Sequence, residues 1–125
     1  GVNMVIWALE NARGGEIFVP KIPSYRITDL ASAIDPACEQ KIVGIRPGEK
    51  IHEEMITRSD SLNTVDFGEC FAILPQSSEY LLDEYCKMND AIPVSHGFSY
   101  DSETNPSFLS VEDLRQLITK NVALE

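Results

Sequence analysis

The residues best placed to do chemistry in this chain are Arg46, Glu49 and Lys50. The apolar run of residues 42–45 predicts a short strand that ends at Arg46, and a Pro-Gly pair follows directly. Proline fixes one backbone angle and glycine frees the next, so this pair predicts a turn that holds the Arg46 guanidinium in one direction. A guanidinium at a strand end, with a lysine nearby, is suited to bind a diphosphate or a carboxylate. The same residues also fit an exposed connection whose charges form surface ion pairs.

A second group of candidates, Lys21 and Ser24, follows the apolar run of residues 17–19 in the sequence Pro-Lys-Ile-Pro-Ser. Ligands of open α/β sheets gather at the carboxyl ends of strands, which makes both side chains candidate ligand contacts. The alternative is that the prolines simply form a stiff extended connection. His52 is more typical of a structural hydrogen-bonding residue than of a catalyst.

Other kinds of site are not indicated. Adjacent carboxylates such as Glu53 and Glu54 point in different directions from one element and fit a solvated face. The sequence has no Asp/His cluster with metal-ligand spacing and no Gly-x-Ser-x-Gly elbow, so we expect no metal. The three cysteines, Cys38, Cys70 and Cys86, lack Cys-x-x-Cys spacing and favour free thiols in a reducing cytoplasm.

The elements that must position these residues follow from the apolar pattern. Residues 2–9 have apolar side chains at helical spacing, and Gly14-Gly15 ends that helix. We expect a buried strand at residues 17–19 closed by Pro20, and then a helix from an N-cap at Thr28 to about residue 34.

Short strands are expected at residues 54–57 and 71–74, with a weaker candidate at 62–67, and residues 89–102 are expected to be mostly loop. Ser110 with Asp113 predicts a capping box that starts a final helix. The predicted fold class is α/β, in an α+β-like form with short strands and flanking helices and no complete Rossmann domain.

The composition excludes several functions. The chain has 125 residues, which is one domain's worth, and its 43% hydrophobic content is typical of a soluble protein. No apolar run is long enough to span a membrane. The net charge of −10 argues against nucleic acid as a partner, although a few local cations still allow a small anionic ligand.

Three blocks in the sequence, read in order, carry a resemblance, and a tail block extends it over nearly the whole chain. The three blocks are Gly14-Gly15-Glu16-Ile17-Phe18-Val19-Pro20-Lys21-Ile22-Pro23-Ser24, Ile27-Thr28-Asp29-Leu30-Ala31, and Gly44-Ile45-Arg46-Pro47-Gly48-Glu49-Lys50-Ile51-His52-Glu53-Glu54-Met55. The tail block contains Gly97-Phe98-Ser99-Tyr100, Asn105-Pro106 and Phe108-Leu109-Ser110-Val111-Glu112-Asp113-Leu114-Arg115. The chain resembles the C-terminal part of inverting UDP-N-acetylglucosamine 4,6-dehydratases, in the extended short-chain dehydrogenase/reductase superfamily.

The resemblance implies a bacterial lyase of surface-glycan or flagellin-sugar biosynthesis that uses NADP and a UDP-sugar substrate. It implies that Arg46 holds the UDP part of the substrate and that Glu49 contacts a hydroxyl group, whereas the residues alone also allow Glu49 to pair with Arg46 or Lys50. Lys50, Lys21 and Ser24 are the other implied substrate contacts. Residues 1–123 then form a C-terminal substrate-binding domain, and residues 124–125 fit an expression-vector remnant.

The features of such an enzyme that bind cofactor and transfer protons are missing from this sequence. It has no Gly-x-Gly-x-x-Gly fingerprint, and none of Tyr25, Tyr80, Tyr85 and Tyr100 has a lysine four residues on. We therefore expect the chain alone to be inactive, with no catalytic residue of its own and an N-terminal Rossmann domain as its partner in a homo-oligomeric parent.

Two alternatives stay open. One is an epimerase or reductase of nucleotide sugars in the same superfamily, and the other is a stand-alone binding or interaction module. A glycine fingerprint and Tyr-x-x-x-Lys in the upstream reading frame separate the enzymes from the module.

Overall fold

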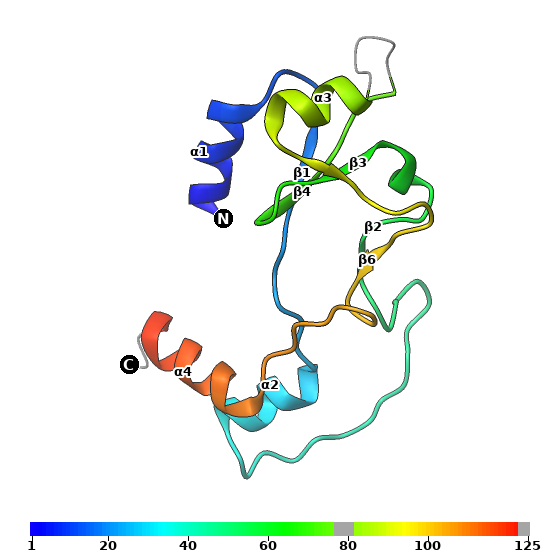
Figure 1. Cartoon of the computed structure of the whole chain (residues 1–125). Helices are drawn as coiled ribbons and strands as arrows, with labels where there is room; N and C mark the ends of the chain where they lie inside the picture. Colours follow the sequence, from blue (N-terminus) through cyan, green and yellow to red (C-terminus); the bar gives the residue numbers. More distant parts are fainter. Residues whose placement is uncertain (77–81, 123–125) are drawn as a thin grey trace. The chain divides into compact units, whose positions relative to one another are not determined.

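The computed structural model describes residues 1–76 and 82–122, which fold as two compact units (Figure 1). The first unit contains residues 1–21 and 54–101, and the second unit contains residues 22–53 and 102–125. Leu124 and Glu125, which the sequence suggests are a vector remnant, lie outside the described residues. Each unit is therefore built from two separate stretches of the chain.

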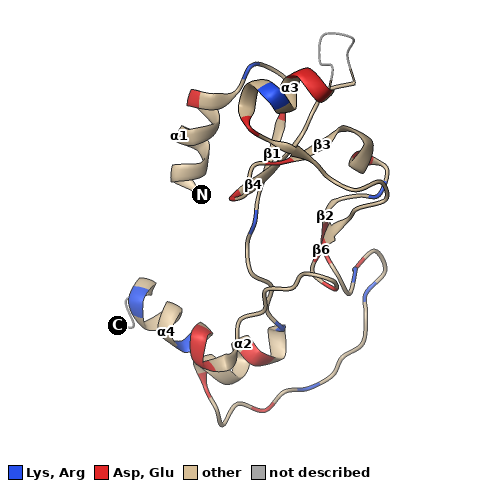
Figure 2. Cartoon of the chain, viewed as in Figure 1, with Lys and Arg blue, Asp and Glu red and all other residues tan. Residues whose placement is uncertain are grey.

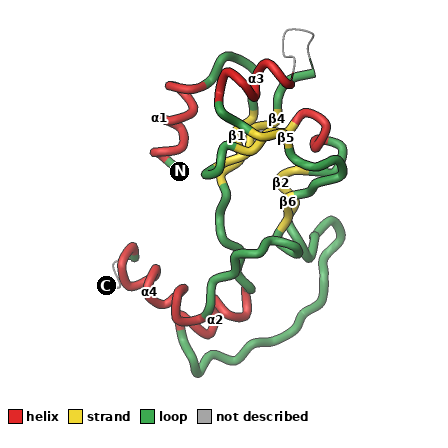
Figure 3. Tube along the Cα trace, viewed as in Figure 1, coloured by secondary structure: helices red, strands yellow, loops and turns green. Residues whose placement is uncertain are grey.

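The first unit contains a four-stranded antiparallel sheet in the order β1-β4-β3-β5. Figure 3 draws the strands in yellow and labels β1, β4 and β5 of this sheet. These strands are β1 (Ile17–Pro20), β4 (Cys70–Ile73), β3 (Thr64–Asp66) and β5 (Ile92–Pro93). The strands predicted at residues 17–19 and 71–74 are confirmed. Pro20 belongs to β1 rather than closing it, because β1 is an edge strand and can lack one ladder donor.

The core of the first unit lies on both faces of this sheet. Successive residues of a strand point to opposite faces, so Phe71 and Ala72 of β4 enter different clusters. One cluster consists of Val65, Ala72, Leu74, Tyr85, Cys86 and Ala91, with α3 (Leu82–Asn89) supplying Tyr85 and Cys86. The other cluster contains Val19, Ile56 and Phe71. The sequence pattern did not predict α3.

Helix α1 (Val2–Asn11) packs against the rest of the first unit through an aromatic ring. The Trp7 ring packs edge-on against Phe18, with 5.1 Å between centroids, and against Phe67 at 5.9 Å. None of its residues is fully buried. Its predicted apolar stripe lies largely in solvent, with Leu9 78% exposed.

A separate two-stranded sheet joins β2 (Glu54–Ile56) to β6 (Tyr100–Asp101) in antiparallel fashion. The strand predicted at residues 54–57 is confirmed, and residues 89–102 are mostly loop as expected. The weaker candidate at residues 62–67 is only partly a strand, because the short 3-10 helix η1 (Asp60–Asn63) precedes β3.

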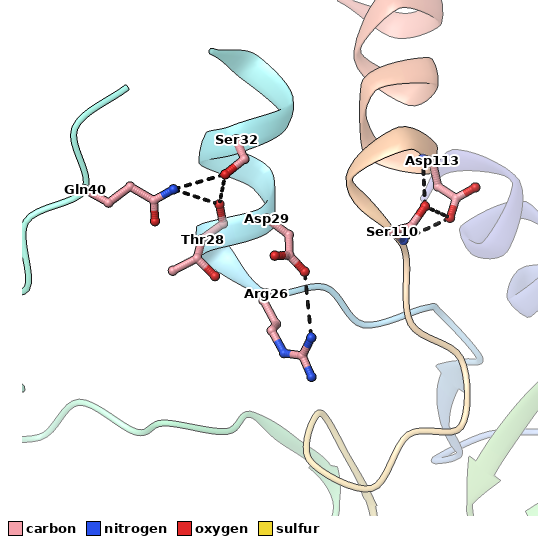
Figure 4. A network of polar contacts seen from close by, with 7 residues as sticks. All are labelled: Arg26, Thr28, Asp29, Ser32, Gln40, Ser110 and Asp113. Carbon is pink, nitrogen blue, oxygen red and sulfur yellow. Dashed lines mark hydrogen bonds and ion pairs between the residues drawn. The ribbon is translucent and has the colours of Figure 1, made fainter. Parts of the chain in front are cut away.

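The second unit pairs α2 (Ile27–Ile34) with α4 (Val111–Asn121), and Ala33 and Leu114 are the buried residues of these two helices. The capping box predicted at the start of α4 is confirmed: the Asp113 backbone N–H donates to the Ser110 hydroxyl oxygen, and the Asp113 carboxylate accepts from the Ser110 backbone (Figure 4).

The N-cap predicted for α2 is wrong. The N-cap is Arg26, two residues earlier, and the helix begins at Ile27, because the carbonyl of Arg26 accepts the first helical hydrogen bonds, from Asp29 and Leu30. Thr28 lies inside the helix, where its own carbonyl accepts a hydrogen bond from the Ser32 hydroxyl (Figure 4).

The strand predicted at residues 42–45 is also wrong. These residues belong to a long loop, and Ile42 is 95% exposed. A strand needs a neighbour for its backbone groups. The described part of the second unit offers none beyond the isolated bridge between Ser24 and Phe108. The described residues form four α-helices and short antiparallel sheets, which is the mixed α/β fold expected from the sequence in its α+β-like form.

Candidate functional site

Residues 46–49 form a tight turn within this exposed loop. The backbone N–H of Glu49 donates to the carbonyl of Arg46 at 3.1 Å, and Gly48 has φ of +88°. Proline at the second position and a glycine with positive φ at the third are typical of a type II turn. The turn predicted from the Pro-Gly pair is thus present, although it is not preceded by a strand.

The carboxylate of Glu49 folds back onto Arg46. Its Oε2 atom accepts a hydrogen bond from the Arg46 backbone N–H at 2.8 Å, and its Oε1 atom lies 3.7 Å from Arg46 Nε. The sequence allowed Glu49 to pair with either Arg46 or Lys50, and in the structure it pairs with Arg46. The Arg46 side chain is 82% exposed, and among the described residues its two terminal nitrogens have no partner. They can therefore bind a ligand oxygen without breaking a contact.

The loop around this turn is locally basic in an acidic chain. Residues 40–52 contain Lys41, Arg46 and Lys50 against a single carboxylate, whereas the chain as a whole has a net charge of −10. Figure 2 shows basic and acidic positions in this loop and in the helices of the second unit. Lys50 and His52 are both exposed. Exposed charges are screened by water and salt, so an anion bound here needs direct hydrogen bonds as well as attraction.

Lys21 has strong partners in the first unit. Its Nζ atom lies 2.7 Å from Asp66 Oδ1 and 4.5 Å from the centre of the Phe71 ring. Its backbone N–H donates to Glu69, which extends the β1–β4 pairing by one residue. Lys21 is thus built into the first unit, whereas Arg46, Glu49, Lys50 and Ser24 belong to the second.

Ser24 is held by the segment that leads into α4. Its backbone N–H donates to Ser107, and its carbonyl accepts from Leu109. The amide of Asn105 donates to the Ser24 hydroxyl and to the Ile22 carbonyl, both at 2.9 Å. No role was predicted for Asn105, and the Asn-Pro pair within the tail block was the available sign of a fixed turn.

The cysteines are free thiols, as expected from their spacing. Burial raises the pKa of Cys70, and the charge of Asp66 adds to this effect. Burial likewise raises the pKa of Cys86. Both thiols therefore stay protonated near neutral pH and are poor nucleophiles. In the described ranges, residues 1–76 and 82–122, no group of three or more His, Cys, Asp or Glu residues is arranged to hold a metal ion.

No helix in the described part of the chain is long and apolar enough to cross a membrane. The described residues also do not form a dinucleotide site. Such a site needs a glycine-rich turn that leads from a parallel strand into a helix. Here Gly14 and Gly15 lead from α1 into β1, and β1 is antiparallel to its neighbour β4.

The described residues form a small mixed α/β fold, and its exposed Arg-Pro-Gly-Glu turn is a candidate anion-binding site. Residues 1–75 match the family described as polysaccharide biosynthesis protein. This match covers more than half of the chain, and the chain therefore belongs to that family.

Individual relatives agree with this assignment. The chain is 43% identical, over 94% of its length, to the inverting UDP-N-acetylglucosamine 4,6-dehydratase of Campylobacter jejuni. Over 58% of its length it is 36% identical to the UDP-glucose 4-epimerase of Rickettsia canadensis, of which it covers 22%. The chain spans about a third, 36%, of the length of the Campylobacter dehydratase.

A solved structure has the same fold. The X-ray structure of Pen from Bacillus thuringiensis superposes with a TM-score of 0.72 and 28% sequence identity. The match covers 94% of this chain and 35% of Pen. The mixed α/β fold seen here therefore corresponds to one part of a larger solved protein.

Proposed function

We propose that this chain is the nucleotide-sugar-binding portion of an inverting UDP-N-acetylglucosamine 4,6-dehydratase, and that Arg46 binds the diphosphate of the substrate. The observation that carries the proposal is the 43% identity to such a dehydratase over 94% of the chain. The substrate is then a UDP-sugar, and the reaction of the longer protein removes one water from it.

The geometry of the turn supports the role of Arg46. Its outward terminal nitrogens match the spacing of two oxygens on a phosphate, and such paired, charge-assisted hydrogen bonds are among the strongest in proteins. Lys50 supplies a second positive charge four residues further on. Lys21 and Ser24 remain proposed contacts, and binding there has to compete with the Asp66 ion pair of Lys21 and the Asn105 hydrogen bond of Ser24.

The chain's own residues do not fit a nicotinamide cofactor, because the glycine turn and the parallel strand–helix unit of a dinucleotide site are absent from the described residues. The sequence also lacks a Tyr-x-x-x-Lys pair. We therefore propose that NADP and the proton-transfer groups belong to another part of a longer protein. The isolated chain is expected to bind UDP-sugar without converting it.

The test uses the longer protein encoded by the same reading frame. Incubation with UDP-N-acetylglucosamine followed by mass spectrometry is expected to show the loss of one water. Arg46→Ala is expected to slow this conversion at least ~10-fold, since it removes charge-assisted hydrogen bonds to phosphate. Lys41→Ala is the matched control, because it removes one exposed positive charge from the same loop. Full activity in Arg46→Ala contradicts the role of the turn.

The second candidate function is epimerisation of a UDP-sugar, which the 36% identity to a UDP-glucose 4-epimerase favours. Epimerisation leaves the mass of the sugar nucleotide unchanged. An unchanged mass together with a new chromatographic peak therefore identifies an epimerase, and loss of water identifies the dehydratase.

The proposal extends to the setting of the longer protein, which we place in the cytoplasm as a homo-oligomer. The free thiols of Cys70 and Cys86 support a reducing compartment. Cell fractionation tests the location, and light scattering of the longer protein tests the oligomer.

A further inference from the structure

We infer that Asn105 is a positioning residue, and that it fixes the Ser24 hydroxyl as a hydrogen-bond donor toward an acceptor oxygen of the substrate. This inference rests on the proposed function, in which Ser24 is one of the contacts of a nucleotide sugar. It goes further because it names the kind of atom that Ser24 recognises and adds Asn105, which acts through Ser24.

The backbone of Ser24 is fixed on both sides. Ser24 forms an isolated parallel bridge with Phe108, where the segment before α2 runs beside the segment before α4 (Figure 1). Its N–H donates to the Ser107 carbonyl and its carbonyl accepts from the Leu109 N–H, both at 2.8 Å. Rotation about χ1 is therefore the freedom that remains to the Ser24 side chain.

Asn105 removes this freedom by holding the hydroxyl itself. Its Nδ2 atom donates to Ser24 Oγ and to the Ile22 carbonyl, both at 2.9 Å. Its Oδ1 atom accepts the Ser107 backbone N–H at 3.0 Å. These neighbours decide which end of the amide is the nitrogen, because a carbonyl can only accept and a backbone N–H can only donate. The nitrogen of Asn105 therefore faces Ser24.

The direction of this bond determines what Ser24 can offer a ligand. A hydroxyl has one O–H donor and two lone pairs, and Asn105 occupies one of the lone pairs. The contacts within the described part of the chain leave the Ser24 proton without an acceptor. Ser24 is half-buried between the exposed residues Pro23 and Tyr25, so a ligand can reach it.

Ligand donors and ligand acceptors are not equivalent at this position. A ligand group that donates to Ser24 has to compete with the Asn105 amide, whereas a group that accepts the Ser24 proton leaves that bond intact. A donor that is already fixed also loses less conformational freedom on binding. The acceptor oxygens of a UDP-sugar belong to its phosphates, its nucleoside or its sugar.

The experiment uses the longer protein and three probes that contain these oxygens in turn. Binding of inorganic pyrophosphate and of UDP is measured by calorimetry, and UDP-N-acetylglucosamine is followed by steady-state kinetics. Ser24→Ala is expected to weaken the recognised probe about three- to tenfold, which is the range for one lost hydrogen bond. For UDP-N-acetylglucosamine the loss should raise KM and leave kcat nearly unchanged. The smallest affected probe identifies the oxygen as phosphate, nucleoside or sugar.

Ser32→Ala is the matched control. The Ser32 hydroxyl also accepts from an amide side chain, that of Gln40 at 3.1 Å, but it donates its own proton to the Thr28 carbonyl (Figure 4). Both serines are half-buried in the second unit. Ser32→Ala is therefore expected to leave all three probes unchanged.

Asn105→Asp tests the positioning role. The carboxylate keeps the shape of the side chain but replaces the two donors by an acceptor, so Ser24 would donate to residue 105 and not to the ligand. This variant should weaken the same probe at least as much as Ser24→Ala. Adding Ser24→Ala to it should cause no further loss, because Asn105 acts through Ser24. Circular dichroism confirms folding of each variant, and Ser24→Ala tests the donor even if Asn105→Asp fails to fold.

The outcomes separate the inference from the proposed function. If Arg46→Ala loses the probes but Ser24→Ala behaves like Ser32→Ala with all three, the inference is wrong and the proposed function stands. Losses from Ser24→Ala and Asn105→Asp that multiply in the double variant give Asn105 a separate structural role and overturn its positioning of Ser24. If the wild-type protein binds none of the probes, the proposed function fails and the inference fails with it.

Discussion

The Nζ atom of Lys21 lies 2.7 Å from the Oδ1 atom of Asp66, 45 residues further along the chain. Lys21 directly follows β1 and Asp66 ends β3, so this ion pair links two strands of the sheet that do not touch each other in its order. The same Oδ1 atom accepts the backbone N–H of Gly68 in the turn that leads to β4. Lys21 therefore has a structural task in the first unit.

Replacing Lys21 with alanine is expected to lower the free energy of unfolding by about 1 kcal/mol, from the lost ion pair and the lost contact with the Phe71 ring. Urea denaturation followed by circular dichroism measures the change. The matched control is Lys41→Ala, an exposed lysine in a loop. If Lys21→Ala instead leaves stability unchanged and weakens UDP binding, Lys21 acts as a ligand contact.

Asp90 is the non-glycine residue of the described chain with a positive φ, at 51°. It follows α3, and the next residue, Ala91, donates its backbone N–H to Cys86 in the hydrogen bond of a Schellman motif. Glycine adopts this conformation without strain. Asp90→Gly is therefore expected to stabilise the chain by about 0.5 to 1 kcal/mol, measured as a higher urea midpoint.

Alanine at the same position tests the reason for that effect. Asp90→Ala removes the carboxylate but keeps a Cβ atom, so it should gain less stability than glycine or none. Equal stabilisation by both variants would assign the gain to the charge of Asp90 near the helix C-terminus instead.

Stability should depend on pH through Glu16. Burial raises the pKa of this carboxyl, but hydrogen bonds from the backbone N–H groups of Arg13 and Gly14, and from the Tyr85 hydroxyl, outweigh that effect and hold it below its ordinary value of 4.5. A lowered folded-state pKa contributes stability that is fully present above pH 4.5 and is lost as the pH falls through the folded value.

The comparison of Glu16→Gln with the wild type isolates this contribution. Glu16→Gln is expected to be less stable at pH 7 and to approach wild-type stability as the pH falls below 4.5, measured by urea midpoints across that range. Glu10→Gln, at an exposed position of α1, should follow the wild type throughout. A stability difference that stays constant with pH would argue against this role of the carboxylate.

Helix α1 should depend on Trp7 far more than on its apolar stripe. Trp7→Ala removes the ring contacts with Phe18 and Phe67 and is expected to cost about 2 kcal/mol, with loss of helical signal in circular dichroism. Leu9→Ala is the control on the same helix. Leu9 is 78% exposed, so this change should alter stability by less than about 0.5 kcal/mol. Equal effects of the two changes would mean that the stripe is covered, for instance by self-association.

The parts of the fold that were predictable from sequence have local causes. The turn at Arg46 follows from proline beside glycine, and the start of α4 follows from Ser110 and Asp113 three residues apart. Helix α3 escaped prediction because Tyr85 and Cys86 are its only fully buried described residues, which leaves no apolar stripe to read. The strand predicted at residues 42–45 is absent even though the apolar run is clear in the sequence. Apolar residues form a strand only where another strand is available to pair with their backbone groups.

In the candidate site, too, the local contacts could be predicted from the sequence and the long-range contacts could not. The contact between Arg46 and Glu49 spans three residues, so the sequence could include it among the alternatives. The partners of Lys21 and Ser24 could not be read from sequence, because Asp66 and Asn105 lie 45 and 81 residues away and only the folded chain brings them together. The resemblance to a dehydratase is the basis for proposing a UDP-sugar as the ligand, whereas the pattern of charges alone fits any diphosphate or carboxylate.

The two units alternate along the chain, and this limits how the gene can recombine and how one unit can be expressed alone. Glu54 pairs with Asp101 in the first unit, and the next residues outward, Glu53 and Ser102, are hydrogen-bonded in the second. No uninterrupted stretch of the gene therefore encodes either unit. A deletion of residues 22–53 would remove more than half of the second unit and leave α4 without its partner α2. Recombination that keeps both units intact therefore has to transfer them together. To express either unit alone, its two stretches have to be joined in one gene or the gene has to be circularly permuted.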